Sequence, residues 1–202
     1  YEGVVGVNVG ANKKSEGKKR IEDYLHCIEK VHKYADYITV NISSPNTPNL
    51  RDLHNANNLS DLVTSIENKV KELKIDIPFF LKISPDETDE SLENIIKTVE
   101  NTFFTGIIAT NTTIDKRSLT NKKYMEIEGG LSGKPLMDKS TDKIKIIKNK
   151  SNGVIPIIGV GGVMNASDFN NKIDAGSKLV QIYTGFVIKG PNILNEILEK
   201  ND

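Results

Sequence analysis

Polar side chains follow several short apolar runs of this sequence. They are amides and hydroxyls: Asn8, Asn41, Ser44, Asn46, Thr110, Asn111 and Thr112. An amide side chain offers both a donor and an acceptor, so it suits a ligand with polar edges. Packing of a hydrophobic core does not explain so many polar groups in matching positions, although Asn8 by itself could simply cap a turn.

A single cation, Lys82, lies inside the apolar run Phe79-Phe80-Leu81-Lys82-Ile83. A buried ammonium group is costly without an anionic partner, so this position favours an electrostatic role at a ligand. The alternative is a lysine whose stem is buried and whose charged end reaches solvent.

Glycines follow the later apolar runs. Gly161 and Gly162 end the segment Pro156-Ile157-Ile158-Gly159-Val160-Gly161-Gly162, and Tyr183 and Thr184 end the next apolar run. Late in a βα barrel, backbone N–H groups at such turns bind phosphate. A tight turn without a ligand would need the same glycines. Gly133 closes a further glycine-rich segment, 129–133, which is either a flexible loop or a close contact with a flat ligand.

The elements that must position these residues alternate along the chain. Short apolar runs predict strands at 4–9, 37–42, 78–83, 106–110, 155–160 and 178–183. Amphipathic runs with apolar residues at three- and four-residue steps predict helices at 20–35, 59–73, 91–99, 141–148, 166–175 and 192–200.

The strand segments are almost wholly apolar, as is typical of parallel strands with helices outside. Repeated βα units form either an open doubly wound sheet or a (β/α)8 barrel. A TIM-type barrel of eight units has about 250 residues, so units of roughly 33 residues predict about six of the eight here. We therefore expect an α/β fold, a single incomplete barrel domain over residues 1–202, with the N-terminal part missing.

Composition excludes several classes of protein. Lys plus Arg and Asp plus Glu both number 27, so the net charge is zero and no basic field for nucleic acid is expected. One cysteine excludes an internal disulfide, and three histidines do not form a plausible metal cluster, so no metal is expected. No apolar run approaches the length of a membrane span.

The segment Asn41-Ile42-Ser43-Ser44-Pro45-Asn46-Thr47-Pro48-Asn49-Leu50-Arg51 resembles the dihydroorotate dehydrogenases of class 2, the quinone-linked type. Further motifs match in family order along the chain: Gly6-Val7-Asn8-Val9-Gly10, Leu81-Lys82-Ile83-Ser84-Pro85-Asp86, Ala109-Thr110-Asn111-Thr112-Thr113, Gly129-Gly130-Leu131-Ser132-Gly133-Lys134-Pro135-Leu136, the glycine segment 156–162 and Leu179-Val180-Gln181-Ile182-Tyr183-Thr184-Gly185.

The resemblance implies an oxidoreductase that converts dihydroorotate to orotate in UMP biosynthesis, with FMN as cofactor and quinone as electron acceptor. Ser44 matches the catalytic base, where class 1 relatives carry cysteine. The positions that match substrate contacts are Asn41, Asn46, Asn111 and Thr112. Those that match FMN contacts are Asn8, Asn41, Lys82, Thr110, Gly133, Gly161, Gly162, Tyr183 and Thr184.

The resemblance also implies what this piece lacks: the first two βα units and the N-terminal helical pair that touches the membrane and binds quinone. A peripheral place on the bacterial cytoplasmic or mitochondrial inner membrane is expected only through that absent part. Two alternatives stay open. One is another flavin barrel acting on a reduced pyrimidine, against which Ser44 and the zero net charge count. The other is a truncated, non-catalytic barrel fragment.

Overall fold

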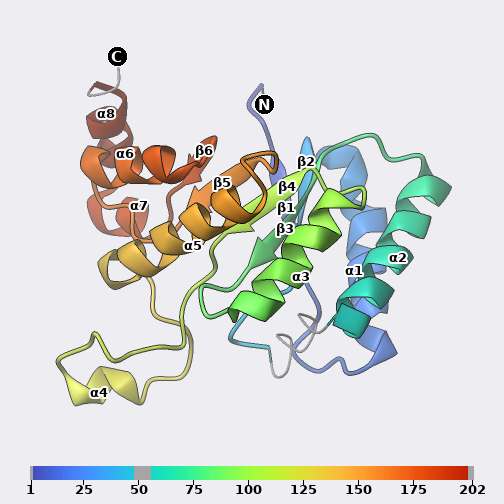
Figure 1. Cartoon of the computed structure of the whole chain (residues 1–202), viewed down its shortest axis with the longest axis horizontal. Coiled ribbons are helices and arrows are strands. Elements are labelled where there is room, and N and C mark those ends of the chain that lie inside the picture. The colour runs from blue at the N-terminus through green and yellow to red at the C-terminus, as the bar shows by residue number, and fades with distance from the viewer. Residues whose placement is uncertain (1, 48–55, 200–202) are drawn as a thin grey trace.

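The computed structural model describes residues 2–47 and 56–199. Six parallel strands form one sheet whose spatial order is the chain order. They are β1 (Gly6–Val9), β2 (Tyr37–Asn41), β3 (Phe79–Ile83), β4 (Gly106–Ala109), β5 (Ile157–Val160) and β6 (Leu179–Gln181). Helices follow the strands in sequence, so the predicted alternation of βα units is confirmed (Figure 1).

Long helices cover one face of the sheet: α1 (Lys18–Val31), α2 (Ala56–Leu73), α3 (Asp89–Glu100), α5 (Met137–Lys150) and α6 (Ala166–Ala175). Shorter ones are α4 (Lys122–Met125), α7 (Thr184–Lys189), α8 (Asn192–Glu199) and the 3₁₀ turns η1 (His32–Tyr34) and η3 (Lys134–Leu136). The α4 segment projects away from the body of the molecule in Figure 1. Sequence periodicity did not predict α4, α7 or η3, since each is too short to repeat an apolar face.

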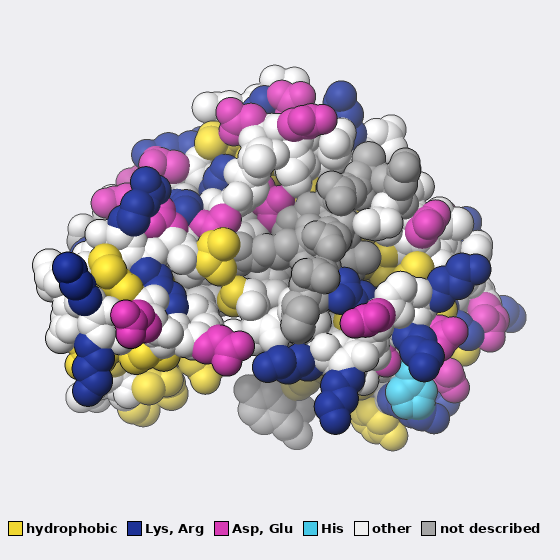
Figure 2. Space-filling view, turned by 90° about the horizontal axis from the view of Figure 1, so that it is seen from below, with side chains coloured by type: hydrophobic (Ala, Val, Ile, Leu, Met, Phe, Trp, Pro, Cys, Tyr) yellow, Lys and Arg dark blue, Asp and Glu magenta, His cyan; other side chains and the backbone are white. Residues whose placement is uncertain are grey.

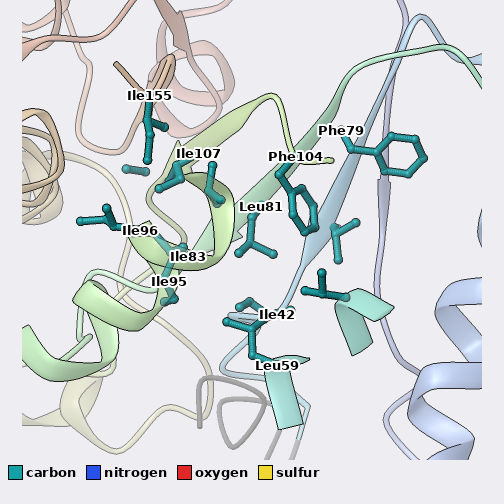
Figure 3. Packing of buried hydrophobic residues seen from close by; sticks show 14 of the residues in the cluster. Ile42, Leu59, Phe79, Leu81, Ile83, Ile95, Ile96, Phe104, Ile107 and Ile155 are labelled. Carbon is teal, nitrogen blue, oxygen red and sulfur yellow. The ribbon is translucent and has the colours of Figure 1, made fainter. Parts of the chain in front are cut away.

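The core lies between the sheet and the helices. Alternate strand residues such as Ile38, Val40, Leu81 and Ile83 point into it and are wholly buried. Leu59, Ile95 and Ile96 reach them from α2 and α3, as Figure 3 shows, and Phe79 and Phe104 complete one end. Each of these side chains contributes roughly 1.5–3 kcal/mol by leaving water, and together they fix which face of every strand points away from the helices.

The opposite face of the sheet is concave. Tyr37 of β2 and Phe80 of β3 meet edge to face there, with ring centroids 5.7 Å apart. Gln181 of β6 donates a hydrogen bond of 3.4 Å to the hydroxyl of Tyr37, although four strand-to-strand steps separate β2 from β6. The sheet therefore curls around its inner face as part of a barrel wall, which confirms the predicted barrel class.

Side chains cap two of the helices that border the site. Thr88 accepts a hydrogen bond from the Ser91 amide at the start of α3, and Asn165 accepts one from the Asp168 amide at the start of α6. Such caps contribute about 1 kcal/mol each. They fix where the two helices begin, and so they fix the short loops that precede them.

Candidate functional site

A cavity of about 170 Å³ lies at the carboxyl ends of β3 to β6. Nine of the residues singled out from the sequence line it: Lys82, Thr110, Asn111, Thr112, Gly133, Gly161, Gly162, Tyr183 and Thr184. All but Gly133 come from the carboxyl ends of different strands, and Gly133 closes the glycine-rich loop before η3. Segments that are far apart in the sequence therefore share one concave site.

The glycine turn after β5 forms one wall. Gly161 and Gly162 have φ values of +118° and +84°, which glycine adopts readily and other residues do not. A Cβ on Gly162 would lie 2.4 Å from the Cα of Met137, so α5 packs directly behind the turn. Within the described residues, the Gly162 N–H has no hydrogen-bond acceptor although the residue is buried. A buried N–H group needs an acceptor, and a ligand in the cavity would supply one.

The segment after β6 meets the Gly133 segment on the same side. The Thr184 hydroxyl donates to or accepts from the Ser132 hydroxyl at 3.0 Å. A Cβ on Gly133 would lie 3.0 Å from the Thr184 methyl group. Tyr183 lies at the rim with its side chain 79% exposed. These contacts hold the two backbone segments close to each other beside the glycine turn.

Lys82 lies on the concave face of β3 and is mostly buried. Burial lowers the pKa of its ammonium group from 10.5, because the low-dielectric surroundings disfavour the charged form. No hydrogen bond or ion pair to Lys82 occurs in the part of the chain that the structure describes. A cation held this way at a cavity wall favours a ligand that carries or develops negative charge.

Asn41 of β2 pairs in register with Lys82 of β3. It is the centre of a hydrogen-bond network that lies on the side of Lys82 away from the glycine turn. Its Oδ1 accepts from the Ser43 amide at 3.1 Å, the Ser43 hydroxyl at 3.0 Å and Asn111 Nδ2 at 3.3 Å. Asn111 Nδ2 also donates to Ser43 Oγ at 3.2 Å, and its Oδ1 accepts from the Thr112 amide at 2.8 Å. The network fixes the orientation of both amide side chains.

Ser44 and Asn46 do not line the cavity; they follow Asn41 in the loop beside it. Ser44 is half-buried, and its Oγ accepts from the Asn46 amide at 3.3 Å. Among the residues whose positions are described, no acidic, basic or histidine side chain hydrogen-bonds to Ser44. A Cβ on Gly130 would lie 1.9 Å from Thr112 Oγ1 and 3.0 Å from Pro45 Cγ, so the glycine-rich loop packs against this segment.

Asn8 also lies outside the cavity lining. It is exposed on the edge strand β1, where it pairs in register with Thr39. Its assignment as a cofactor contact stays a prediction. The segment 48–55, which continues the motif that begins at Asn41, lies outside the described residues.

Several residues that support the site were not singled out from the sequence. Tyr24 of α1 is fully buried and donates a 2.6 Å hydrogen bond to the carbonyl of Asn41. Burial also raises the pKa of its phenol, so the hydroxyl keeps its proton. Asp86 accepts from the Thr113 hydroxyl and the Ile114 amide and pairs with Lys139, anchoring the base of the 113–131 excursion.

Lys172 of α6 is a third residue that supports the site and that sequence reasoning missed. It is completely buried and hydrogen-bonds to Met137, Ser140 and Thr141 at the start of α5. The one signal in the sequence was the spacing of Asp168, Lys172 and Ala175, which puts two charges on the face of α6 that also carries alanine. Periodicity alone does not separate such a face from a solvated one.

The surface shows no single dominant charge. Figure 2 shows lysines and arginines interspersed with aspartates and glutamates over the face it presents. None of the helices in the described ranges is both long enough and apolar enough to cross a membrane. Over those same ranges, no cluster of three or more His, Cys, Asp or Glu residues is arranged to hold a metal ion.

A curled sheet of parallel βα units, with a cavity and a glycine turn at the carboxyl ends of its strands, defines the class of α/β barrels. The comparison with protein families narrows this class. The family model described as Dihydroorotate dehydrogenase matches residues 1–201. The chain belongs to the dihydroorotate dehydrogenase family.

Curated relatives agree with this assignment. A protein from Shewanella frigidimarina is 48% identical over 96% of this chain, and one from Christiangramia forsetii is 45% identical over 98% of it. An Escherichia coli O1:K1 relative is 44% identical over 98% of the chain. All three are named dihydroorotate dehydrogenase (quinone). The chain covers 58%, 58% and 60% of their respective lengths.

Solved structures show the same fold. Ligand-free DHODH from Eimeria tenella superimposes with a TM-score of 0.91 at 31% identity, over 98% of this chain and 58% of that one. The same enzyme in complex with ferulenol gives a TM-score of 0.90 at 31% identity, over 98% and 57%. The fold of this chain is therefore part of the barrel found in these enzymes.

Proposed function

We propose that this chain forms the cofactor- and substrate-binding wall of an FMN-dependent dihydroorotate dehydrogenase, which oxidises dihydroorotate to orotate in UMP biosynthesis and passes the electrons to quinone. The observation that carries the proposal is the convergence of Lys82, Asn111 and Gly162 on one cavity in a chain of this family. The names of the quinone-linked relatives support the choice of acceptor.

The residues present fit FMN on two counts. Lys82 presents a mostly buried ammonium group without a partner in the described chain, and Gly162 presents a backbone N–H that lacks an acceptor there. The first suits the electron-rich edge of a flavin, and the second suits a phosphate group. The residues that would hold FMN are Asn8, Asn41, Lys82, Thr110, Gly133, Gly161, Gly162, Tyr183 and Thr184. When bound, FMN supplies the acceptor for the hydride that leaves C6 of dihydroorotate.

The substrate would be held by Asn41, Asn46, Asn111 and Thr112. Because Asn41 Oδ1 already accepts from Ser43 and Asn111, its amide orientation is fixed and its Nδ2 group is left to donate. Asn111 commits Nδ2 to Asn41 and Ser43, so it offers the substrate the remaining lone pair of Oδ1. Amide groups fixed in this way match the imide and amide edges of a pyrimidine.

Ser44 would remove the proton from C5 of the substrate. A serine hydroxyl is a weak base, so the proton must pass on to water or to a neighbouring group as it is taken. The Asn46 amide donates to Ser44 Oγ and leaves the hydroxyl hydrogen of Ser44 directed elsewhere. Loss of this proton and of a hydride from C6 together removes two electrons and two hydrogens, which converts dihydroorotate to orotate.

We also assign residues 1–202 to one barrel domain that is completed by units outside this sequence. Contact with the bacterial cytoplasmic or mitochondrial inner membrane would be made outside it too, through an N-terminal region of the kind that quinone-linked members of the family carry.

The test is to measure flavin content from its visible absorption band and then the bleaching of that band by dihydroorotate. The chain is expressed alone and within a protein of its relatives' full length. We expect the full-length protein to hold FMN and to bleach on addition of dihydroorotate. Ser44→Ala should slow bleaching by about 10²- to 10⁴-fold, as expected for loss of a general base.

Ser167→Ala, at an exposed position of α6, is the matched control and should leave the bleaching rate unchanged. A full-length protein that holds no flavin would exclude the proposed function. Full-speed bleaching in Ser44→Ala would leave the activity in place and exclude Ser44 as the base.

A further inference from the structure

Lys172 occupies an unusual position for a lysine. Its side chain is 0% exposed, on the face of α6 that packs against the start of α5. Its ammonium group hydrogen-bonds to Thr141 Oγ1 at 2.8 Å, to the Met137 carbonyl at 3.3 Å and to Ser140 Oγ. Three hydrogens thus meet three acceptors, which is the full capacity of the group. A buried charge this completely satisfied fixes its neighbours in one arrangement.

The acceptors lead from Lys172 to the glycine turn. The Met137 carbonyl takes hydrogens from Lys172 and from the Thr141 hydroxyl, at 3.3 and 2.7 Å. The Ser140 hydroxyl lies 3.0 Å from both the Met137 carbonyl and the Gly161 carbonyl. Because Lys172 and Thr141 already occupy both lone pairs of the Met137 carbonyl, the single hydrogen of the Ser140 hydroxyl is left for the Gly161 carbonyl. Lys172 therefore controls, through Ser140, where the Gly161 carbonyl points.

The orientation of this carbonyl fixes the next N–H group. In a trans peptide the C=O and the following N–H point in opposite directions. Because the Gly161 carbonyl points to Ser140, the Gly162 N–H points away from α5. Gly161 and Gly162 both line the cavity, and no acceptor for the Gly162 N–H occurs in the described part of the chain.

We infer that Lys172 is a positioning residue for the anion-binding turn: acting through Ser140, it directs the Gly162 N–H toward the phosphate of the bound cofactor. This inference rests on the proposed function, in which that cofactor is FMN. Lys172 touches neither cofactor nor substrate in this arrangement. Its buried positive charge also lies behind the turn, where it would add to the attraction for a dianion.

The charged groups around Lys172 leave it protonated at neutral pH. Burial lowers its pKa to about 8, while Asp138 and Asp142 of α5 and Asp168 of α6 act in the opposite direction. Asp168 is itself held by Lys134, whose ammonium group is 2.7 Å from Asp168 Oδ1, and by the Met164 amide. The binding measurements are made at pH 7, where Lys172 carries its charge.

The experiment compares FMN with riboflavin, which is the same flavin without the phosphate. Dissociation constants for both are measured by fluorescence titration of the full-length apoprotein. We expect Lys172→Met to weaken FMN binding at least 10-fold while riboflavin binding changes less than threefold. Ser140→Ala, which keeps the lysine but removes the link to Gly161, should weaken FMN binding three- to 10-fold with the same selectivity.

Lys145→Met is the matched control, because it removes one lysine from an exposed position of α5. It should leave the ratio of the two dissociation constants unchanged. A purely structural role for Lys172 would weaken both ligands equally, and that outcome overturns the inference. If Lys172→Met does not fold, Ser140→Ala decides: an unchanged ratio in this variant also overturns it. A wild-type protein that binds neither flavin instead overturns the proposed function on which the inference rests.

Discussion

The two sides of the candidate site are built differently. On the side of the Gly161–Gly162 turn, backbone groups face the cavity, and buried side chains of α5 and α6 hold them from behind. On the side of Asn41, side chains face the site and hold one another, as the bonds among Asn41, Ser43 and Asn111 show. Lys82 lies between the two sides, on β3.

The difference reflects what each side has to recognise. A phosphate is nearly spherical and accepts hydrogen bonds from any direction, so a rigid set of N–H groups is sufficient. A flat pyrimidine has a fixed order of donors and acceptors, which only side chains with matching order can read. We therefore expect substitutions on the glycine side to act through the backbone and substitutions on the amide side to act through single hydrogen bonds.

Lys82→Met should have the largest effect, because it removes the buried cation that the proposed function places at the electron-rich edge of the flavin. Flavin reduction should slow by about 10²- to 10³-fold, the usual loss when one electrostatic donor is removed. The free energy of unfolding of the apoprotein should rise by about 1 kcal/mol, since burial lowers the pKa of this lysine and its charge opposes folding. Stopped-flow bleaching and urea unfolding measure the two quantities.

Lys178→Met, an exposed lysine next to β6, provides the comparison and should change neither quantity. A Lys82→Met protein that is less stable than wild type would show that the charge has a partner and contributes to folding.

Gly162→Ala should have the next largest effect. The new Cβ would meet the backbone of Met137 at 2.4 Å, and φ is +84°. We expect the free energy of unfolding to fall by roughly 2–4 kcal/mol, together with loss of FMN affinity. Urea unfolding and flavin titration provide the measurements.

Gly153→Ala separates the two causes. Gly153 has φ +73° but nothing within 4 Å of a new Cβ, so only the backbone cost of about 1 kcal/mol should appear. Equal losses at Gly153 and Gly162 would mean that α5 moves away easily and does not support the turn.

Tyr24→Phe should have the smallest effect. It removes the 2.6 Å hydrogen bond to the Asn41 carbonyl and leaves that carbonyl without its buried donor. The free energy of unfolding should fall by about 1–2 kcal/mol. The Michaelis constant for dihydroorotate should rise by a larger factor than the dissociation constant of FMN, because Asn41 is one of four proposed substrate contacts and one of nine proposed FMN contacts.

Tyr34→Phe is the control for this change, because Tyr34 is 78% exposed. A loss of FMN affinity in Tyr24→Phe that equals the loss of substrate affinity would show that the two sides are coupled and do not act separately.

Much of the fold could be predicted from the sequence because its signals are local. All six strands, the five long helices and α8 occur where apolar runs and amphipathic spacing predict them, and α6 has the predicted bounds. Differences lie at element ends, as at α5, which starts at Met137 and not at 141. Met137 and Ser140 in the first turn of α5 are buried against Lys172 and the Gly161–Gly162 turn, which belong to segments that the local pattern does not include.

The cavity could be predicted to the extent that strand ends must share one edge of a parallel sheet. That rule brings Lys82, Asn111 and Gly162 together. It does not identify Tyr24 or Lys172, since both reach the site from helices on the far side of the sheet. A buried polar residue on a helix differs from a surface one only in what packs against it, and sequence spacing does not contain that information.

The order of the strands in the sheet is also their order along the chain. The backbone of each strand therefore pairs only with strands of the neighbouring units, and no connection crosses over another. The wall can grow or shrink by a whole unit at either end without rerouting any loop, in the manner of a stacked repeat. The gene for such a protein could be divided between two units, and the two polypeptides could then associate, since every cut would leave two matching strand edges.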